Sequence, residues 1–232
     1  MLQLRPAAER GRTGADWLDS RHSFAFGDYR DPDRMGFSIL RVINEDLIAP
    51  GGGFPRHGHR DMEIVTYVLA GALEHRDSLG NGTLIRPGEV QRMSAGSGVQ
   101  HSEFNHSQTE PVHLLQIWLL PNQLGIQPGY AQQSFPATDL RARLCPLVSP
   151  DGRDGSLLAH QDGLVYAAQL GAGEGVTHAV ASGRCVYLQV ARGRIEVDGV
   201  VLGPGDGAAL TQVEAVRLSG LESAEVLLFD LP

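Results

Sequence analysis

The sequence predicts an all-β protein in which one antiparallel barrel or sandwich is present twice. Among its 232 residues are 29 Gly and 13 Pro, which separate short apolar runs instead of interrupting long ones. Frequent turns between short strands are typical of antiparallel β folds. In addition, a pattern of strands and turns in the first half recurs in the second half.

In the first half, the short apolar runs predict strands, and Gly-rich clusters between them predict turns. One short helix is expected at residues 14–20. The segment 121–139 contains three prolines and no apolar period, so we interpret it as a surface connection between the halves. The predicted strands cover 36–43, 62–69, 83–87 and 112–120.

The second half repeats landmarks of the first. The stretch VLAGALE (68–74) is followed by Pro-Gly-Glu at 87–89, and VARGRIE (190–196) is followed by Pro-Gly-Asp at 204–206. A repeat of this size indicates a duplicated domain. We therefore predict an N-terminal domain over 1–130 and a C-terminal domain over 131–232. Strands of the second domain are expected at 164–170, 185–191, 194–202, 215–220 and 225–231.

Composition narrows the classes of function. The net charge is −8, and all 19 basic residues are Arg, which excludes lysine Schiff-base chemistry and a P-loop lysine. An acidic chain disfavours binding to nucleic acid or to anionic membranes. The start of the chain is polar, and no apolar stretch reaches the ~20 residues that a membrane helix needs. We expect a cytoplasmic protein that contacts neither nucleic acid nor a membrane.

Two pairs of metal-ligand side chains have i, i+2 spacing. They are His57 with His59, and His101 with Glu103, each next to a Gly-rich turn. Side chains at i and i+2 of a strand point to the same face. Three imidazoles and a carboxylate suit a divalent transition metal, and a small barrel has room for one ion.

The chain resembles the cupins around these pairs. Residues 53–71 match the first cupin motif and residues 87–105 the second, with Gly96 where the second motif usually has Pro. More specifically, the first half resembles the pirin family of bicupins, through those stretches and 17–32, 37–46 and 74–82. The second half matches only in outline, through LVYAAQL, YLQVARG and GPGDGA.

The resemblance implies two cupin barrels, of the double-stranded β-helix or jelly-roll type. It implies that the first barrel holds one divalent metal ion on His57, His59, His101 and Glu103. Fe(II) is the expected ion, with Mn, Ni, Co and Zn as alternatives. The second barrel is expected to be degenerate and without metal, because the positions equivalent to the ligands are Ala179, Ala181, Leu218 and Gly220.

The resemblance also implies an oxidoreductase of the quercetin 2,3-dioxygenase type. Its substrates would be a small aromatic flavonol such as quercetin and dioxygen, and the central ring would open with loss of carbon monoxide. Glu103 would be catalytic, as the base that takes the proton of the flavonol 3-hydroxyl. The alternative is a non-enzymatic, metal-bound redox sensor that acts through a protein partner. A third interpretation is a cupin whose flavonol activity is incidental to another substrate.

Several further residues have two interpretations. Glu63 follows the spacing of the carboxylate ligand in many cupins, and we expect it near the pocket or in an ion pair with an Arg. Phe37, Phe54, Met62 and Met93 either line an aromatic pocket or pack in the core. We expect His75 and His106 to be structural or solvated, His75 with a hydrogen bond to Asp77, and His106 with a place at the pocket mouth as its alternative. The remaining histidines, His22, His113, His160 and His178, are expected to be structural or solvated.

Overall fold

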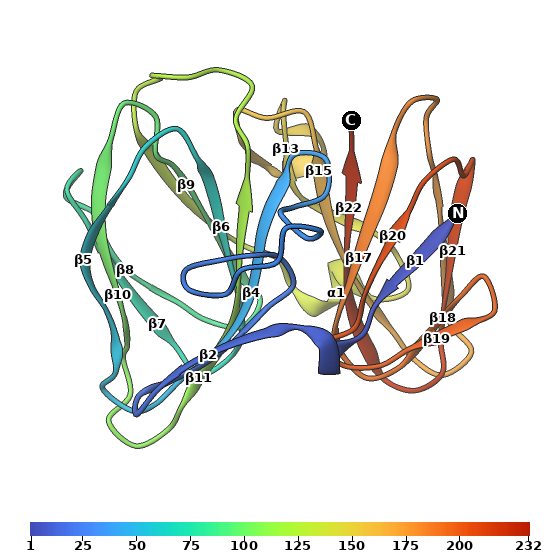
Figure 1. Cartoon of the computed structure of the whole chain (residues 1–232), viewed down its shortest axis with the longest axis horizontal. Coiled ribbons are helices and arrows are strands. Elements are labelled where there is room, and N and C mark those ends of the chain that lie inside the picture. Colours follow the sequence, from blue (N-terminus) through green and yellow to red (C-terminus); the bar gives the residue numbers. More distant parts are fainter.

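Two barrels lie side by side in the computed structural model, which describes all 232 residues, Met1–Pro232 (Figure 1). Each barrel combines a seven-stranded sheet with a four-stranded sheet. The prediction of an all-β chain with two cupin barrels is confirmed. The only α-helix, α1 (Ala137–Leu140), has four residues, so the structure contains no helix that could cross a membrane.

The first barrel is built mainly from the N-terminal half. Its large sheet has the order β12 (Gly129–Ser134), β9 (Glu89–Ser94), β6 (Glu63–Ala70), β11 (Val112–Leu119), β4 (Leu40–Ile48), β3 (Leu18–His22) and β2 (Gly11–Ala15). Its small sheet has the order β5 (Gly53–His59), β10 (Val99–Asn105), β7 (Leu73–Asp77) and β8 (Gly82–Ile85).

The second barrel repeats this arrangement with shorter strands. Its large sheet has the order β1 (Leu2–Arg5), β20 (Gly207–Leu210), β17 (Cys185–Arg192), β22 (Ala224–Leu231), β15 (Leu164–Leu170), β13 (Cys145–Ser149) and β14 (Leu157–Leu158). Its small sheet has the order β16 (Gly175–Ala179), β21 (Ala215–Gly220), β18 (Ile195–Val197) and β19 (Val200–Leu202).

The two halves of the chain exchange edge strands. β1, at the start of the chain, pairs antiparallel with β20 and so completes the sheet of the second barrel. β12, from the segment expected to be a plain connection, pairs with β9 of the first barrel. β12 also spans the predicted domain boundary after residue 130, and the position of this boundary stays a prediction.

The expected helix at 14–20 is wrong. The segment belongs to a hairpin in which Gly14 pairs with Asp19 across the turn between β2 and β3. Trp17, in this turn, packs edge-on against Phe54 with ring centroids 5.1 Å apart. So short a helix is marginal by itself, and pairing with β4 gives this segment more backbone hydrogen bonds.

The expected strand at 194–202 is also interrupted. It forms the hairpin β18–β19, which reverses at Asp198-Gly199. Both residues have positive φ, +49° and +79°. Asp-Gly with two positive φ angles favours a tight hairpin turn, because that turn matches the twist of the strands. The sequence contains this turn signal inside the run of apolar residues.

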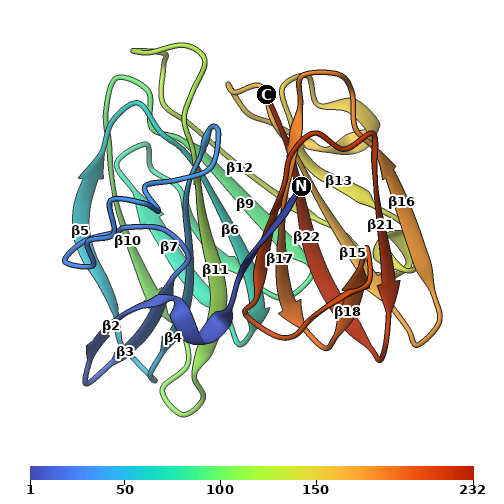
Figure 2. The same ribbon diagram turned by 45° about the vertical axis from the view of Figure 1, so that its right-hand side comes forward.

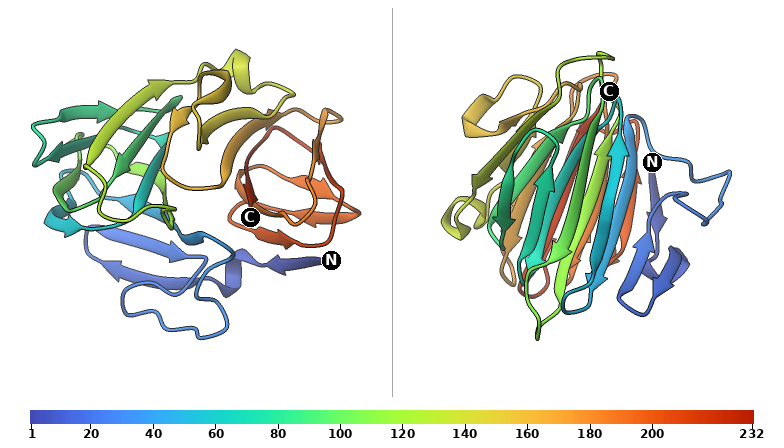
Figure 3. Two further views of the ribbon diagram at one scale, coloured as in Figure 1. Left: turned by 90° about the horizontal axis from the view of Figure 1, so that it is seen from above. Right: turned by 90° about the vertical axis from the view of Figure 1, so that its left-hand side faces the viewer.

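The largest hydrophobic core lies between the two barrels, where their large sheets face each other (Figures 2 and 3). It joins Val65 and Leu115 from the first barrel to Leu227 and Phe229 from the second. A separate apolar cluster fills the second barrel. Strand residues that alternate with those of the shared core therefore point into the interior of the first barrel, where the candidate site lies.

Candidate metal centre

Two neighbouring strands of the small sheet position the four predicted ligands. His57 and His59 lie on β5, while His101 and Glu103 lie on β10, with His57 directly opposite His101. The ring centroids of the three histidines are 4.5–4.8 Å apart. One ring nitrogen from each histidine lies within 4.8 Å of the others. The sequence prediction that these side chains share a face is thus met by the geometry.

Glu103 joins this cluster through His101. Its carboxylate, His101 and His75 form a second group whose ligand atoms lie within 4.8 Å of one another. All three residues of that group are buried. The structure therefore brings the four predicted residues together and adds His75, which the sequence did not place at the site.

Burial keeps two of the imidazoles neutral. Burial, and then the neighbouring His101 and His57, lower the pKa of His59 to about 4. Burial, and then His57 and His75, lower the pKa of His101 to about 3. A neutral imidazole has a free lone pair on one nitrogen, which is the form that binds a metal.

Hydrogen bonds outside the cluster orient His57 and His101. His57 Nδ1 donates to the Pro55 carbonyl at 2.8 Å, which leaves Nε2 as the nitrogen for a ligand. His101 Nδ1 lies 3.4 Å from His75 Nδ1, and its Nε2 is buried with no partner. If His101 binds a metal through Nε2, its Nδ1 must donate to His75.

This bond continues to a buried carboxylate. His75 is fully buried, and its Nε2 lies 3.1 Å from Asp77 Oδ2, so the expected bond between these residues is present. Burial by itself would raise the pKa of Asp77. Hydrogen bonds from Asn81 and His75 outweigh this effect, so the pKa of Asp77 is lowered. Tyr130 of β12 stacks on His75 at 4.8 Å. With Nε2 of His101 free for a ligand, donation runs in one direction, from His101 to His75 and from His75 to Asp77.

A second chain holds Glu103. Gln116 of β11 donates from Nε2 to Glu103 Oε2 at 2.8 Å, and Thr66 of β6 donates to Gln116 Oε1 at 3.0 Å. The other carboxylate oxygen, Oε1, is buried and has no partner. Since buried polar atoms are nearly always hydrogen-bonded, two unpartnered ones, His101 Nε2 and Glu103 Oε1, fit a missing ligand. The residues therefore fit a divalent metal ion.

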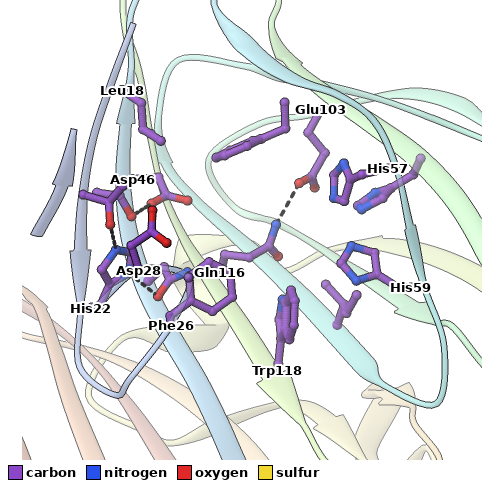
Figure 4. Close-up of a pocket in the computed structure, with 17 residues that line it drawn as sticks. Leu18, His22, Phe26, Asp28, Asp46, His57, His59, Glu103, Gln116 and Trp118 are labelled. Carbon is purple, nitrogen blue, oxygen red and sulfur yellow. Dashed lines mark hydrogen bonds between the residues drawn. The ribbon is translucent and has the colours of Figure 1, made fainter. Parts of the chain in front are cut away.

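A cavity of about 200 Å³ opens from this cluster (Figure 4). Phe54, Ile64 and Trp118 form apolar walls beside the histidines, and Trp118 meets His59 edge-on at 5.0 Å. Further from the histidines, the wall becomes polar. Polar residues there are Thr13, Ser20, His22, Asp28, Asn44 and Asp46.

Sequence reasoning missed Gln116, Trp118 and the polar wall. The signal for Gln116 is present, because a glutamine in the middle of the apolar run 112–120 needs a polar partner inside the barrel. Of the four apolar candidates, Phe54 lines the cavity, while Phe37 packs against the core between the barrels. Met62 and Met93 pack with Ile64 in a small cluster.

The structure meets neither expectation for Glu63. Ile64 and the Thr66–Gln116 pair face the interior of the barrel, so strand alternation turns Glu63 to the opposite face. There its Oε2 accepts a hydrogen bond from Ser94 at 2.8 Å, and burial raises its pKa. Arg92 is the nearby Arg, but it forms no salt bridge with Glu63. Glu63 is therefore not a pocket residue.

Three further histidines have side-chain partners other than the predicted ligands. His22 lines the cavity, but both of its nitrogens are bonded, to Asn44 at 2.7 Å and Thr13 at 2.8 Å. His106 is exposed beside Glu74 and does not line the cavity. His113 bonds Glu45 at 2.8 Å.

The second barrel lacks the donor set at the equivalent strands. β16 pairs with β21 as β5 pairs with β10, which places His178 opposite Val216. His178 Nε2 lies 2.7 Å from Asp230, which Arg184 also binds. Leu218, which the sequence offset aligns with His101, pairs with Val176 and not with Ala179, and it is buried in the apolar cluster of this barrel.

Comparisons with known proteins identify the family. The pirin family model matches residues 3–119, and the model of the quercetinase C-terminal cupin domain matches residues 146–231. The chain is 48% identical to a quercetin 2,3-dioxygenase of Escherichia coli (strain K12), covering 100% of this chain and 99% of that one.

A solved structure shows the same similarity over the whole chain. The crystal structure of the bacterial pirin YhhW from Escherichia coli in complex with nickel(II) superposes with a TM-score of 0.96. The two chains are 47% identical, and the match covers 100% of this chain and 99% of YhhW. With both barrels matched in sequence and fold, this chain belongs to the pirin family.

Proposed function

We propose that this protein is a metal-dependent flavonol dioxygenase of the quercetin 2,3-dioxygenase type. His57, His59, His101 and Glu103 hold one divalent ion, and Fe(II) is the ion we propose. The observation that carries the proposal is the pair of buried, unpartnered atoms, His101 Nε2 and Glu103 Oε1, beside two further imidazoles. The name of the relative from Escherichia coli supports the same reaction.

The protein residues have separate roles in this proposal. When bound, a redox-active ion would supply the electron transfer that dioxygen chemistry requires. Phe54, Ile64 and Trp118 exclude water and bind the flat rings of the substrate. Gln116 fixes the Glu103 carboxylate through Oε2, so that the carboxylate faces the site, where it would hold the ion and take the proton of the flavonol 3-hydroxyl.

Anaerobic binding followed by an oxygen pulse tests the proposal. Protein loaded with Fe(II) should bind quercetin without oxygen and shift its visible absorbance. The pulse should then consume the flavonol and release one equivalent of carbon monoxide. The double variant His57→Ala/His101→Ala is the control and should do neither. If the loaded protein takes up no oxygen with quercetin or other flavonols, the enzymatic proposal is wrong and a redox sensor becomes the better interpretation.

A further inference from the structure

The end of the cavity remote from the histidines contains polar groups that the metal site does not use. Asn44 and Asp46 lie two residues apart on β4, so both side chains point into the first barrel. Figure 4 places Asp46 and His22 on one side of Gln116, and His57 and His59 on the other. The cavity therefore has a metal-binding end and a separate polar end.

Asp46 is a buried carboxylate with too few partners. The residue is 3% exposed, and Ser20 Oγ, which donates to Oδ1, is its only hydrogen-bond partner. No Arg or His pairs with it, although buried carboxylates usually have such a partner. Burial, opposed by the bond from Ser20, raises the pKa of Asp46 to about 7. Its second oxygen is left for a donor that the protein does not provide.

Asn44 offers the complementary group. Its side-chain oxygen is bonded to His22 Nδ1 at 2.7 Å, and His22 is fixed in turn by Thr13. The Nδ2 group of Asn44 donates no hydrogen bond within the protein, and the residue is 4% exposed. An acceptor on Asp46 and a donor on Asn44 thus lie side by side. A hydroxyl group, which donates one hydrogen bond and accepts others, matches both.

We propose that Asn44 and Asp46 form a second subsite in this cavity, which binds a hydroxyl group of the substrate at the end remote from the metal. The inference rests on the proposed function and narrows it, because it selects polyhydroxylated aromatic substrates over flavonols whose only hydroxyl is the chelating one. A site built to hydrogen-bond a hydroxyl rejects an analogue without it, since its own polar groups are then left unpaired.

Two flavonols with the same chelating group test the subsite. Quercetin has hydroxyls on its outer rings, while 3-hydroxyflavone has only the chelating hydroxyl. Titration without oxygen, with the Ni(II)-loaded full-length protein, should give quercetin a dissociation constant at least tenfold lower. In Asp46→Leu the two constants should come within about threefold of each other, mainly because quercetin binds less tightly. Metal content should be the same in both proteins.

Two further variants keep the test decisive. Asp46→Asn retains an acceptor for Ser20, so it should fold even where Asp46→Leu does not, and it should lose part of the preference. Glu45→Gln alters a carboxylate on the opposite face of the same strand, paired with Arg10 and His113, and should leave the preference unchanged.

The outcomes separate the two proposals. Equal binding of the two flavonols by the parent overturns the subsite and leaves the proposed function standing. A preference that survives in both Asp46 variants also overturns it. If neither flavonol binds to the metal-loaded parent, the proposed function fails, and the subsite fails with it.

Discussion

At the scale of single residues, the candidate site depends on which atoms have partners and which do not. His57, His101 and Glu103 each use one polar atom to bind a neighbour, and the atom that remains faces the site. Such outer hydrogen bonds fix the tautomer of a histidine and the orientation of a carboxylate before a metal arrives. The residues behind the ligands should therefore affect the metal without touching it.

His75 is the clearest case. The variant His75→Phe should keep the stacking on Tyr130 but remove the acceptor for His101 Nδ1. We expect an affinity for Ni(II) about 10–100-fold lower, the usual effect of losing an outer partner of a ligand. Competition with a chromophoric chelator measures it. His113→Gln changes a histidine outside the site and should have no effect, and an unchanged affinity in His75→Phe would contradict the role given to His75.

Glu103→Gln separates metal binding from proton transfer. An amide oxygen still coordinates a metal and still accepts from Gln116, but it cannot take a proton at neutral pH. With the site saturated with metal, flavonol turnover should fall by about 10²–10⁴-fold, the range for loss of a general base. The variant should bind quercetin without the absorbance shift of the deprotonated flavonol. Turnover within about threefold of the parent would show that Glu103 is not the base.

At the scale of elements, the turn between β9 and β10 leads into the strand that carries His101. Gly96 in this turn has a φ of +45°, and a Cβ atom there would collide with the carbonyl of Ile126. The residue departs from the usual proline of the second cupin motif, and proline cannot adopt a positive φ. The chain crossing at Ile126 thus requires glycine at this position.

Gly96→Ala should therefore destabilise the protein more than Gly125→Ala, which places an alanine at another position of positive φ. Gly125 also has a positive φ, +67°, but nothing lies within 4 Å of the position of its Cβ. Both variants introduce backbone strain of about 1–2 kcal/mol, and only Gly96→Ala adds a collision with backbone. Urea unfolding should show a larger loss of unfolding free energy for Gly96→Ala. Equal losses would mean that the turn moves freely away from Ile126.

At the scale of the whole molecule, the barrels differ in what fills them. The interior of the second barrel is apolar, with Leu188, Leu218 and Leu228 fully or almost fully buried. The interior of the first contains the histidine cluster and the cavity. The second barrel supports the first through the shared core, to which Tyr187 and Phe229 contribute aromatic rings.

This difference predicts one metal ion per chain. Elemental analysis of the full-length protein, after loading with Ni(II) and removal of excess metal, should give a stoichiometry of one. His57→Ala/His101→Ala should give none, because the double variant keeps a single imidazole and Glu103 from the donor set. Stoichiometric metal in that variant, or two ions in the parent, would contradict the assignment of the site to the first barrel.

The sequence by itself determined the fold class, the repeat and which of the candidate ligands share a face. Period-2 alternation depends only on backbone geometry, so His57 with His59, and His101 with Glu103, had to share a face wherever those stretches formed strands. Turn signals and apolar runs gave most strands for the same local reason, and the cupin and pirin motifs added the pairing of the two stretches.

Only the tertiary structure decided which faces meet. Alternation cannot tell which side of a strand is the inside of a barrel, so it does not decide that Glu63 points away from the cavity or that Gln116 points into it. His75, Asn44 and Asp46 reach the site through strand pairings between residues far apart in the sequence, as does β1 in joining the second barrel. Register between distant strands is set by packing over the whole molecule, and no local pattern encodes it.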